Sequence, residues 1–532
     1  MKLPAATAAA LVLAAAASLG LSVQSARRAA DHLRSLNDAH PPLADAPPVL
    51  VPPPGRAART VVLVVLDGLR ADTSRGLPAL EALRARGASA VAHTHFPSIS
   101  SPNYVSLLTG VPPRHSGVRT NDYAGRVAVD NLFARVRAAG LRSAYVSQLS
   151  EAVPELFPDA DEAVLAPWPG TAVSAARAAI ARGVDFLVVV HNAPDEAGHA
   201  HGAASRAYRD AAAQADRDLG EIVAALDLER DAVLVTADHG HTDAGGHGGV
   251  EPEVMAVPLV LAGAGIRPGA RIDDAALVDL APTAAALLGV ASPGHALGRT
   301  LVEALAVPAP DRLRIADAMR RGIVDALATQ LAAARARAAD ATQRQRGLEL
   351  ASLALATLAF VVWAHRRGAV FLDARALCAG VLPGPVVLSA FVVLVGGLTP
   401  SVVAGRPDAI AANAVAAGVL ATAVHPLLVL GTFMGRPPRS RLRTAAGAAL
   451  VGIFAALVCS HGAWALLGGD VLAERFFGPG DVVLPMLVQL AAAAQAGGVF
   501  LALVLEMVVH WSRASMRGRV AAAPARLVRA VP

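Results

Sequence analysis

One segment, residues 231–249, limits what this chain can fold into more than any other. It begins with an apolar run of strand length, Asp231-Ala-Val-Leu-Val-Thr, and continues into the glycine-rich loop Thr236-Ala-Asp-His-Gly-His-Thr-Asp-Ala-Gly-Gly-His-Gly-Gly. An apolar strand that opens directly into a tight loop is typical of the carboxyl end of a buried parallel strand. Open α/β sheets bind their ligands at this edge. We therefore predict a largely parallel sheet with a site where this strand ends.

The same loop carries side chains that suit a metal ion. Asp238 and His239 are adjacent, and His247 follows eight residues later, with glycines between them that let the loop fold back. Carboxylate oxygen and imidazole nitrogen are donors for a borderline divalent cation such as Zn²⁺. A polar surface loop with solvated histidines would have the same composition. The loop alone therefore leaves both interpretations open.

Two other predicted strands end in polar side chains of the same kind. Residues 60–66 are β-branched and aliphatic and lead into Asp67, while residues 185–191 lead toward Asp195 and His199. Asp195 and His199 are four residues apart, so on a helix they share one face and can share one cation. Asp67 could instead cap the helix that we expect over residues 77–87. Together, three strand ends direct acids and histidines toward one edge of the sheet.

A hydroxyl-rich segment, residues 95–110, runs into a helical pattern. Ser98, Ser100 and Ser101 lie where that helix should begin. A helix N-terminus favours an anionic group, which suits a serine that accepts and carries a phosphoryl group. Each of these serines could equally be an N-cap residue, and spacing alone does not choose among them.

Composition divides this polar part from the rest of the chain. Hydrophobic residues make up 54% of the 532 residues, and the mean hydropathy is +0.48, which is too apolar for a purely soluble protein. Residues 1–25 are predicted to be a signal anchor or signal peptide, and residues 26–59 a proline-rich stalk. Five apolar runs within residues 348–511 each approach the roughly 20 residues needed to cross a bilayer.

The positive charges predict a topology. Arginine and lysine are abundant after the first, third and fifth apolar runs and scarce after the second and fourth. By the positive-inside rule, we expect a multi-pass protein of the cytoplasmic (inner) membrane. Residues 60–305 would form an extracytoplasmic domain, residues 306–347 a helical linker and residues 512–532 a basic cytoplasmic tail. Nucleic acid is not expected as a partner, because the arginines are not gathered with aromatic residues, which are only 4% of the chain.

These segments together resemble the alkaline phosphatase superfamily. Within it they are most similar to the type I phosphodiesterase and nucleotide pyrophosphatase branch, and above all to the membrane enzymes that resemble glycosylphosphatidylinositol (GPI) ethanolamine phosphate transferases. The resemblance implies a doubly wound, alkaline-phosphatase-like α/β core followed by an α-helical transmembrane bundle. It covers residues 60 to about 300 and rests on the motifs Val-Leu-Asp67-Gly-Leu-Arg-Ala-Asp, Ser100-Ser-Pro-Asn-Tyr-Val-Ser-Leu-Leu-Thr-Gly110, Gly198-His199-Ala-His-Gly and Ala-Asp238-His239-Gly-His-Thr-Asp-Ala-Gly-Gly-His247-Gly.

The resemblance also implies roles for individual residues. The nucleophile of the family lies ten residues before the glycine of a Thr-Gly pair, which selects Ser100, and an asparagine twenty-one residues further on, here Asn121, binds a phosphate oxygen. Two divalent metal ions are implied, Zn²⁺ or, on the same donors, Mn²⁺. One ion would be bound by Asp195, His199 and His247. The other would be bound by Asp67, Asp238 and His239 and would also contact Ser100. Position 241 departs from the family pattern, with His in place of Met.

We therefore expect a membrane-anchored, dimetal phosphoric-ester enzyme with a serine phospho-enzyme intermediate. It would act outside the cytoplasm on a lipid or lipid-linked substrate, with the lipid bilayer as its partner. The enzyme would be a phosphodiesterase or a phosphoethanolamine-type phosphotransferase, which differ only in the second nucleophile.

Two other functions compete with this expectation. A sulfatase on the same fold is one, although the domain has no cysteine and the residues after Ser100 lack a Ser-x-Pro-x-Arg pattern. A non-catalytic membrane scaffold or transporter with an extracytoplasmic domain is the other. It would need a row of polar residues in the apolar runs, which are mostly Ala, Val and Leu.

Overall fold

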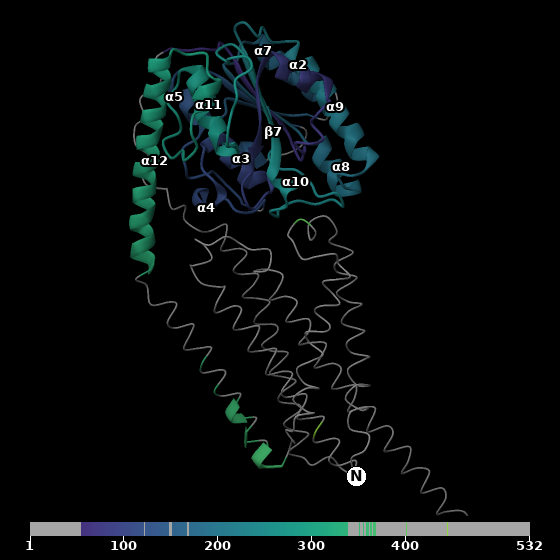
Figure 1. Cartoon of the computed structure of the whole chain (residues 1–532), viewed down its shortest axis with the longest axis vertical. Coiled ribbons are helices and arrows are strands. Elements are labelled where there is room, and N and C mark those ends of the chain that lie inside the picture. Colours follow the sequence, from purple (N-terminus) through teal and green to yellow (C-terminus); the bar gives the residue numbers. More distant parts are fainter. Residues whose placement is uncertain are drawn as a thin grey trace, which may run out of the picture.

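The computed structural model describes residues 55–121, 123–147, 152–166 and 170–338, with a few further positions in the C-terminal part: 351, 355, 358–360, 362, 363, 365–368, 401 and 444. The described domain is a layered α/β structure (Figure 1). Helices α3, α5 and α11 lie on one side of a central sheet, and α2, α7 and α9 lie on the other. The predicted mixed α/β core, with helices on both faces, is therefore confirmed.

The sheet has eight strands in the order β4-β3-β5-β1-β6-β7-β2-β8. Among its described pairings, only those made by β7 are antiparallel. The strands, in chain order, are β1 Val61–Leu66, β2 Gly87–His93, β3 Ser143–Ser147, β4 Glu162–Leu165, β5 Phe186–His191, β6 Ala232–Thr236, β7 Ala256–Gly263 and β8 Ala275–Ala276.

Strand β1 lies between β5 and β6 in the parallel part of the sheet. All six of its residues are buried, as expected for a Val- and Leu-rich strand with both faces covered. It pairs in parallel with β5, where Leu66 lies opposite His191, and with β6, where Val65 lies opposite Thr236. Because the three strands run in one direction and end in register, the segments that follow them leave the sheet at the same edge.

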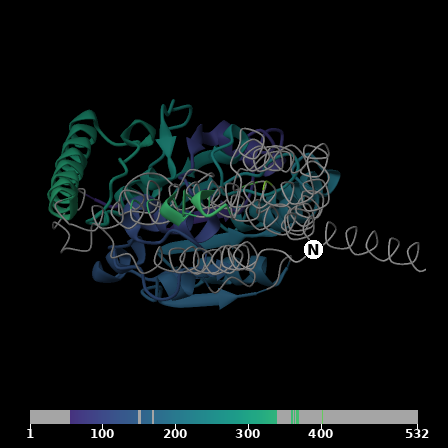
Figure 2. The same ribbon diagram turned by 90° about the horizontal axis from the view of Figure 1, so that it is seen from below.

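The helices connect and cover these strands. Their bounds, including the short 3-10 helices η1 and η2, are α2 Pro78–Arg86, α3 Ser100–Thr109, α4 Pro113–Ser116, α5 Leu132–Ala138, α6 Ala152–Leu156, α7 Thr171–Ala181, α8 Ala193–His201, α9 Arg206–Val223, α10 Pro252–Met255, η1 Leu277–Asp279, α11 Leu280–Leu288, η2 Val302–Ala304 and α12 Ala309–Ala338. Seen from below, α12 lies at one edge of the domain, away from the middle of the sheet (Figure 2).

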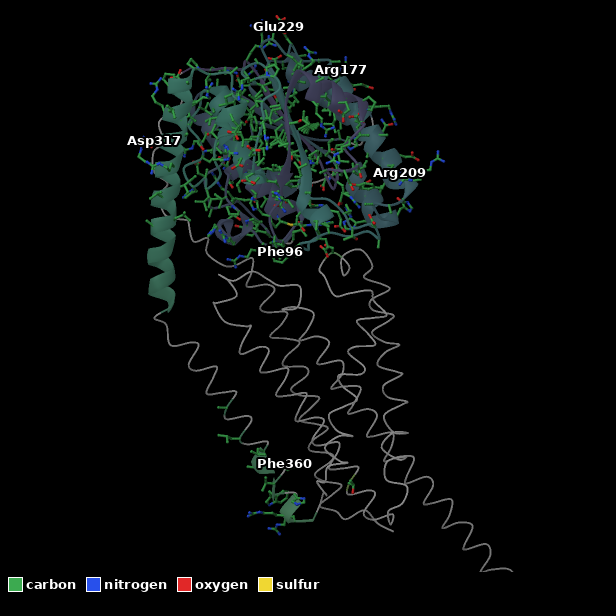
Figure 3. All side chains as sticks on the ribbon, in the orientation of Figure 1. Phe96, Arg177, Arg209, Glu229, Asp317 and Phe360 are labelled. Carbon is green, nitrogen blue, oxygen red and sulfur yellow. The ribbon has the colours of Figure 1, made fainter. Side chains whose placement is uncertain are left out.

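The carboxyl end of the sheet faces one end of the domain. Glu229, which precedes β6, and Phe96, which precedes α3, are labelled at opposite ends of the domain in Figure 3. Asp67 and Asp238 follow the carboxyl ends of β1 and β6, so they lie toward the end that carries Phe96. This is the edge where the sequence predicts the site.

Two strands lack a clear sequence signal. Strand β2 consists mainly of small residues (GASAVAH) and leaves several of them partly or fully exposed. Strand β4 (EAVL) is short, largely exposed and at the edge of the sheet. Neither segment has the continuous apolar run that predicts the buried strands β1, β5 and β6, because little of its surface faces the core.

Several predicted segments fall on residues outside the described ranges. They are the anchor at residues 1–25, most of the stalk at residues 26–59, nearly all of the apolar runs within residues 348–511 and the tail at residues 512–532. Within the described residues, no helix combines the length and the apolar character that a bilayer crossing requires. The transmembrane bundle therefore stays a prediction.

Candidate metal centre

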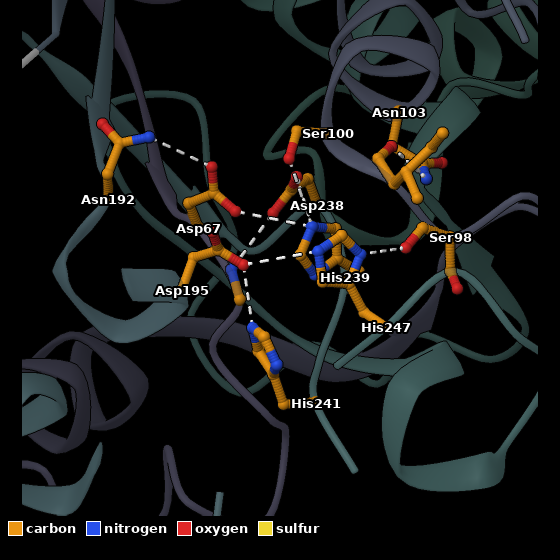
Figure 4. Close-up of polar contacts among 12 residues, drawn as sticks. Asp67, Ser98, Ser100, Asn103, Asn192, Asp195, Asp238, His239, His241 and His247 are labelled. Atoms are coloured by element: carbon orange, nitrogen blue, oxygen red, sulfur yellow. Dashed lines mark hydrogen bonds and ion pairs between the residues drawn. The ribbon is translucent and has the colours of Figure 1, made fainter. Parts of the chain in front are cut away.

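Acidic and imidazole side chains from three strand ends meet at one point (Figure 4). Asp67 directly follows β1, Asp195 and His199 lie on α8 just after β5, and the remaining three follow β6. The six predicted ligands are Asp67, Asp195, His199, Asp238, His239 and His247. The loop after β6 is not a polar surface loop, because His239 and His247 have exposed fractions of 0% and 4%. The alternative of solvated histidines is therefore wrong.

One half of the centre lies against the end of β1. The Nε2 atom of His239 is 3.5 Å from Oδ1 of Asp67 and 3.3 Å from Oδ2 of Asp238. The Oγ atom of Ser100 is 3.3 Å from the same nitrogen. Asp67, Asp238 and His239 are all buried, and Asp67 does not cap the helix that follows β1, whose N-cap residue is Leu77.

The other half lies beside α8 and is more open. Oδ1 of Asp195 is 3.6 Å from Nε2 of both His199 and His247. The two Nε2 atoms of those histidines are 3.0 Å apart. The side chain of His199 is 38% exposed and that of Asp195 is 18% exposed. The rings of His239 and His247 stack at a centroid distance of 3.7 Å and join the two halves.

Hydrogen bonds assign the tautomer of two of these histidines. Nδ1 of His239 lies 3.2 Å from the carbonyl oxygen of Gly240, and Nδ1 of His247 lies 2.8 Å from the carbonyl oxygen of Ser98. A carbonyl accepts only, so each Nδ1 carries the proton, and the lone pair of each Nε2 points into the centre. A backbone carbonyl on the far ring nitrogen is the usual support of a metal-binding histidine.

Two buried carboxylate oxygens indicate that a cation fits at this point. Oδ1 of Asp67 and Oδ2 of Asp238 are buried and have no hydrogen-bond partner among the described residues. The other oxygen of Asp67, Oδ2, accepts hydrogen bonds from the hydroxyl of Tyr104 and, at 3.2 Å, from Nδ2 of Asn192. Asp67 is therefore held on one side and left with a bare oxygen on the side that faces His239. Buried, unpaired carboxylates are costly, and a divalent cation would satisfy both.

The pKa values of these side chains also indicate an excess of buried negative charge. Burial, followed by the charges of Asp238 and Asp195, raises the pKa of Asp67 well above its ordinary value. Burial raises the pKa of Asp238 to about 6 and lowers the pKa of His239 to about 3. Too much negative charge is buried here, whereas the imidazoles stay neutral and keep their lone pairs. This combination of donors fits a bound metal ion.

Asp195 differs from the other two acids. Burial alone would raise its pKa, but the hydrogen bond to His241 and the nearby imidazoles outweigh burial and lower the pKa of Asp195 below its ordinary value. Its carboxylate is thus stabilised as an anion by the surrounding histidines, whereas burial leaves the pKa values of Asp67 and Asp238 raised. The two halves of the centre therefore have opposite electrostatics.

Ser100 is the first residue of α3, and its hydroxyl does not cap that helix. The N-cap residue is Ile99, so none of the three candidate serines has the capping role. The buried side chain of Asn103 fixes the loop before the helix, because it bonds the backbone of His95, Pro97 and Ile99. Asn121 lies beside the same turn, where its Oδ1 accepts a hydrogen bond of 2.9 Å from the backbone N–H of Ser101.

Several supporting residues were not predicted from the sequence. The hydroxyl of Ser98 accepts from the N–H of Gly248 at 3.0 Å and donates to the carbonyl of Gly249 at 2.7 Å, so it holds the loop that carries His247. Ser401, from the C-terminal part, accepts from the N–H of Gly249 and donates to Glu251, both at 2.8 Å. Sequence spacing carries no signal for such contacts, since the partners are about 150 residues apart.

The comparison with protein families supports the same region. Residues 61–139 and 135–257 match the family described as type I phosphodiesterase / nucleotide pyrophosphatase. The predicted resemblance to this branch is therefore confirmed for the part of the chain that contains all six predicted ligands and Ser100.

Two curated relatives and one solved structure align with parts of this chain. GPI ethanolamine phosphate transferase 1 of Mus musculus is 29% identical over 307 residues, which cover 47% of this chain and 33% of the relative. The 2,3-bisphosphoglycerate-independent phosphoglycerate mutase of Roseobacter denitrificans is 37% identical over 134 residues, 24% of this chain and 25% of the relative. The solved structure of the alkaline phosphatase PafA aligns with a TM-score of 0.41 at 14% identity, over 47% of this chain and 99% of that chain. The chain thus spans about a third or less of these two curated relatives.

Proposed function

Because its residues 61–257 match the type I phosphodiesterase / nucleotide pyrophosphatase family, we propose that this chain is a two-metal phosphoric-ester enzyme with Ser100 as its nucleophile. One observation carries the proposal: the hydroxyl of Ser100 lies 3.3 Å from Nε2 of His239, a residue shared by the two groups of carboxylates and imidazoles that could each hold a metal ion. A nucleophile beside a bimetal centre is the arrangement used for in-line displacement at phosphorus.

Each half of the centre would hold one ion, Zn²⁺ or Mn²⁺. Asp67, Asp238 and His239 would hold the ion beside Ser100. Asp195, His199 and His247 would hold the other. When bound, the two ions supply positive charge that stabilises the phosphoryl oxygens and lowers the pKa of a coordinated hydroxyl.

The residues of the chain would carry out a double displacement. The hydroxyl of Ser100 loses its proton to solvent, and Oγ, as an alkoxide, forms a bond to phosphorus while the bond to the leaving oxygen breaks; that oxygen departs with the electron pair. Asn121 would donate a side-chain N–H to a non-bridging oxygen and so orient the phosphoryl group. An oxygen of water or of an acceptor hydroxyl then forms a bond to phosphorus while the bond from phosphorus to Oγ breaks, and the proton of the attacking group replaces the one that Ser100 lost. The first case is hydrolysis and the second is transfer.

The substrate proposed for this site is a phosphodiester of a lipid or of a lipid-linked molecule. The mouse relative is named a GPI ethanolamine phosphate transferase. The apolar runs within residues 348–511 would hold the domain at the extracytoplasmic face of the cytoplasmic membrane. Phosphodiesterase activity and phosphoethanolamine-type transfer are both compatible with the centre, because they differ only in the acceptor.

The test uses the purified full-length chain in detergent micelles. Metal content is measured by elemental analysis, and turnover is compared for p-nitrophenyl phosphate and bis-p-nitrophenyl phosphate. Ser100→Ala should keep both ions and lose at least about 1,000-fold in turnover, because the covalent route is lost. Ser101→Ala is the matched control. The hydroxyl of Ser101 has no assigned role, and the substitution keeps the hydrogen bond from the backbone N–H of residue 101 to Asn121.

A phosphoserine trapped at residue 100 and identified by mass spectrometry would locate the nucleophile directly. The proposal fails if Ser100→Ala turns over the diester at the wild-type rate, or if the wild-type chain carries no metal and is equally active after chelation.

A further inference from the structure

His241 lies among the predicted ligands without having been predicted as one of them. Its side chain is fully buried, with an exposed fraction of 0%. Its Nε2 atom is 2.8 Å from Oδ1 of Asp195, closer than the 3.6 Å that separates this oxygen from Nε2 of His199 and of His247 (Figure 4). His241 is thus the imidazole in closest contact with Asp195, and its position alone is compatible with two roles, a metal ligand or a hydrogen-bond donor.

The other ring nitrogen of His241 distinguishes these roles. The backbone N–H of Gly246 donates to Nδ1 of His241 at 3.2 Å. A ring nitrogen that accepts an N–H carries no proton, so in the neutral ring the proton is on Nε2. Nε2 is then a donor to Asp195 and has no lone pair for a metal ion. His239 and His247 show the reverse pattern, with Nδ1 protonated against a carbonyl and Nε2 free.

The surroundings of the ring are shaped to hold it in this position. A Cβ atom at position 198 of α8 would lie 2.6 Å from Cδ2 of His241, so only glycine there lets the ring pack against the helix. Gly246 has a φ of 89°, a conformation that favours glycine and that presents its N–H to Nδ1. Turning the ring over would leave this N–H without its acceptor.

We propose that His241 is a positioning residue that orients Asp195 through its Nε2–H and does not bind the metal itself. The inference rests on the proposed two-ion site and adds a supporting contact to the half that contains Asp195, His199 and His247. Donors that hold a ligating carboxylate contribute about 10- to 100-fold to metal affinity. The half that contains Asp67 has equivalent supports in Tyr104 and Asn192.

Two substitutions separate orientation from ligation in the full-length chain. His241→Met keeps a side chain of similar length without an N–H donor. His241→Gln places an amide nitrogen where Nε2 stands and can still donate to Asp195. Zinc affinity is measured by competition with a chromophoric chelator and stoichiometry by elemental analysis. We expect His241→Met to weaken one of the two ions by about 10- to 100-fold and His241→Gln to remain within about 3-fold of wild type.

The outcomes are distinct. Wild-type affinity in His241→Met would show that the contact has no role and would overturn the inference. Equal losses in both variants would show that the ring itself is a ligand and would overturn it as well. A wild-type chain that binds no ion would instead defeat the proposed function.

A measurement on the unmutated chain covers the case in which a variant does not fold. With ¹¹³Cd bound and histidines labelled with ¹⁵N, we expect cadmium–nitrogen coupling at Nε2 of His199, His239 and His247 and none at His241, whose Nε2 should keep its proton. Coupling at His241 would contradict the inference.

Discussion

The two halves of the candidate metal centre are built in different ways. The half beside Ser100 combines Asp67, Asp238 and His239, which are fully or almost fully buried and come from the ends of adjacent strands. In the other half, α8 carries Asp195 and His199, and the side chain of His199 is 38% exposed. In the first half burial is the largest cause that raises the pKa of Asp67 and of Asp238, whereas in the second the hydrogen bond to His241 and the nearby imidazoles outweigh burial and lower the pKa of Asp195. The comparison teaches that the histidines of the chain compensate the charge of Asp195, whereas the buried acids of the first half have no such compensation among the described residues.

The largest effect should follow from damage to the buried half. Asp238→Asn removes a ligand charge next to Ser100, so we expect loss of one ion and a fall in diester turnover of at least about 1,000-fold. His199→Ala, in the exposed half, should weaken the other ion and reduce turnover less, by about 100-fold. Elemental analysis and initial rates measure both. Equal losses in the two variants would remove the functional distinction between the halves.

After metal is removed by a chelator, substitutions in the two halves should change the melting temperature in opposite directions. In chain stripped of metal, Asp67→Asn removes a buried charge that Asp238 repels, so the melting temperature should rise by about 2–4 °C, equivalent to about 1 kcal/mol. Asp195→Asn removes an anion that the imidazoles stabilise, so the melting temperature should fall. With metal bound, both variants should be less stable than wild type. Differential scanning fluorimetry with and without chelator provides the four values, and shifts of the same sign after chelation would contradict this account.

His115, which lies outside the centre, should make the stability of the domain depend on pH. Burial lowers the pKa of His115 to about 4, and its Nε2 has no hydrogen-bond partner among the described residues. Between about pH 6.5 and 4 the unfolded chain therefore binds a proton that the folded chain does not, so this residue lowers stability as the pH falls through that window. His115→Gln should flatten this part of the stability profile, measured as the denaturant midpoint against pH. A profile as steep as that of wild type would show that His115 does not cause the slope.

The smallest effect concerns the contact between Ser401 and the loop after His247. Ser401→Ala removes the acceptor of the Gly249 N–H and the donor to Glu251, while every predicted ligand stays in place. We expect zinc affinity to fall by about 3- to 10-fold, because a buried hydrogen bond contributes about 1 kcal/mol. Ser401→Thr, which keeps the hydroxyl, is the control. The contact would have no influence on the centre if Ser401→Ala and Ser401→Thr bound zinc equally well.

Much of the fold and of the centre was predictable because the signals are local. Strands β1, β5 and β6 are continuous apolar runs, and parallel strands in register bring the residues after them to one edge of the sheet. That geometry alone accounts for the meeting of Asp67, Asp195 and Asp238. Strand β2, made of small residues, has no comparable signal.

The supports of the centre could not be predicted in the same way. His241 stands inside a predicted motif, yet its role depends on a hydrogen bond from Gly246 that only the folded loop reveals. Tyr104 bonds Asp67 across 37 residues, and Ser98 bonds Gly249 across 151. Which side chains support a ligand is decided by tertiary packing, and the sequence pattern carries no record of it.

The central claim is that two metal ions sit beside Ser100 in two separate sets of ligands. Anomalous diffraction from zinc-loaded crystals of the full-length chain tests it most directly. We predict two zinc peaks, one among Asp67, Asp238 and His239 and one among Asp195, His199 and His247. No peak in the centre, or a single peak with Asp67 and Asp238 left without an ion, would contradict the account.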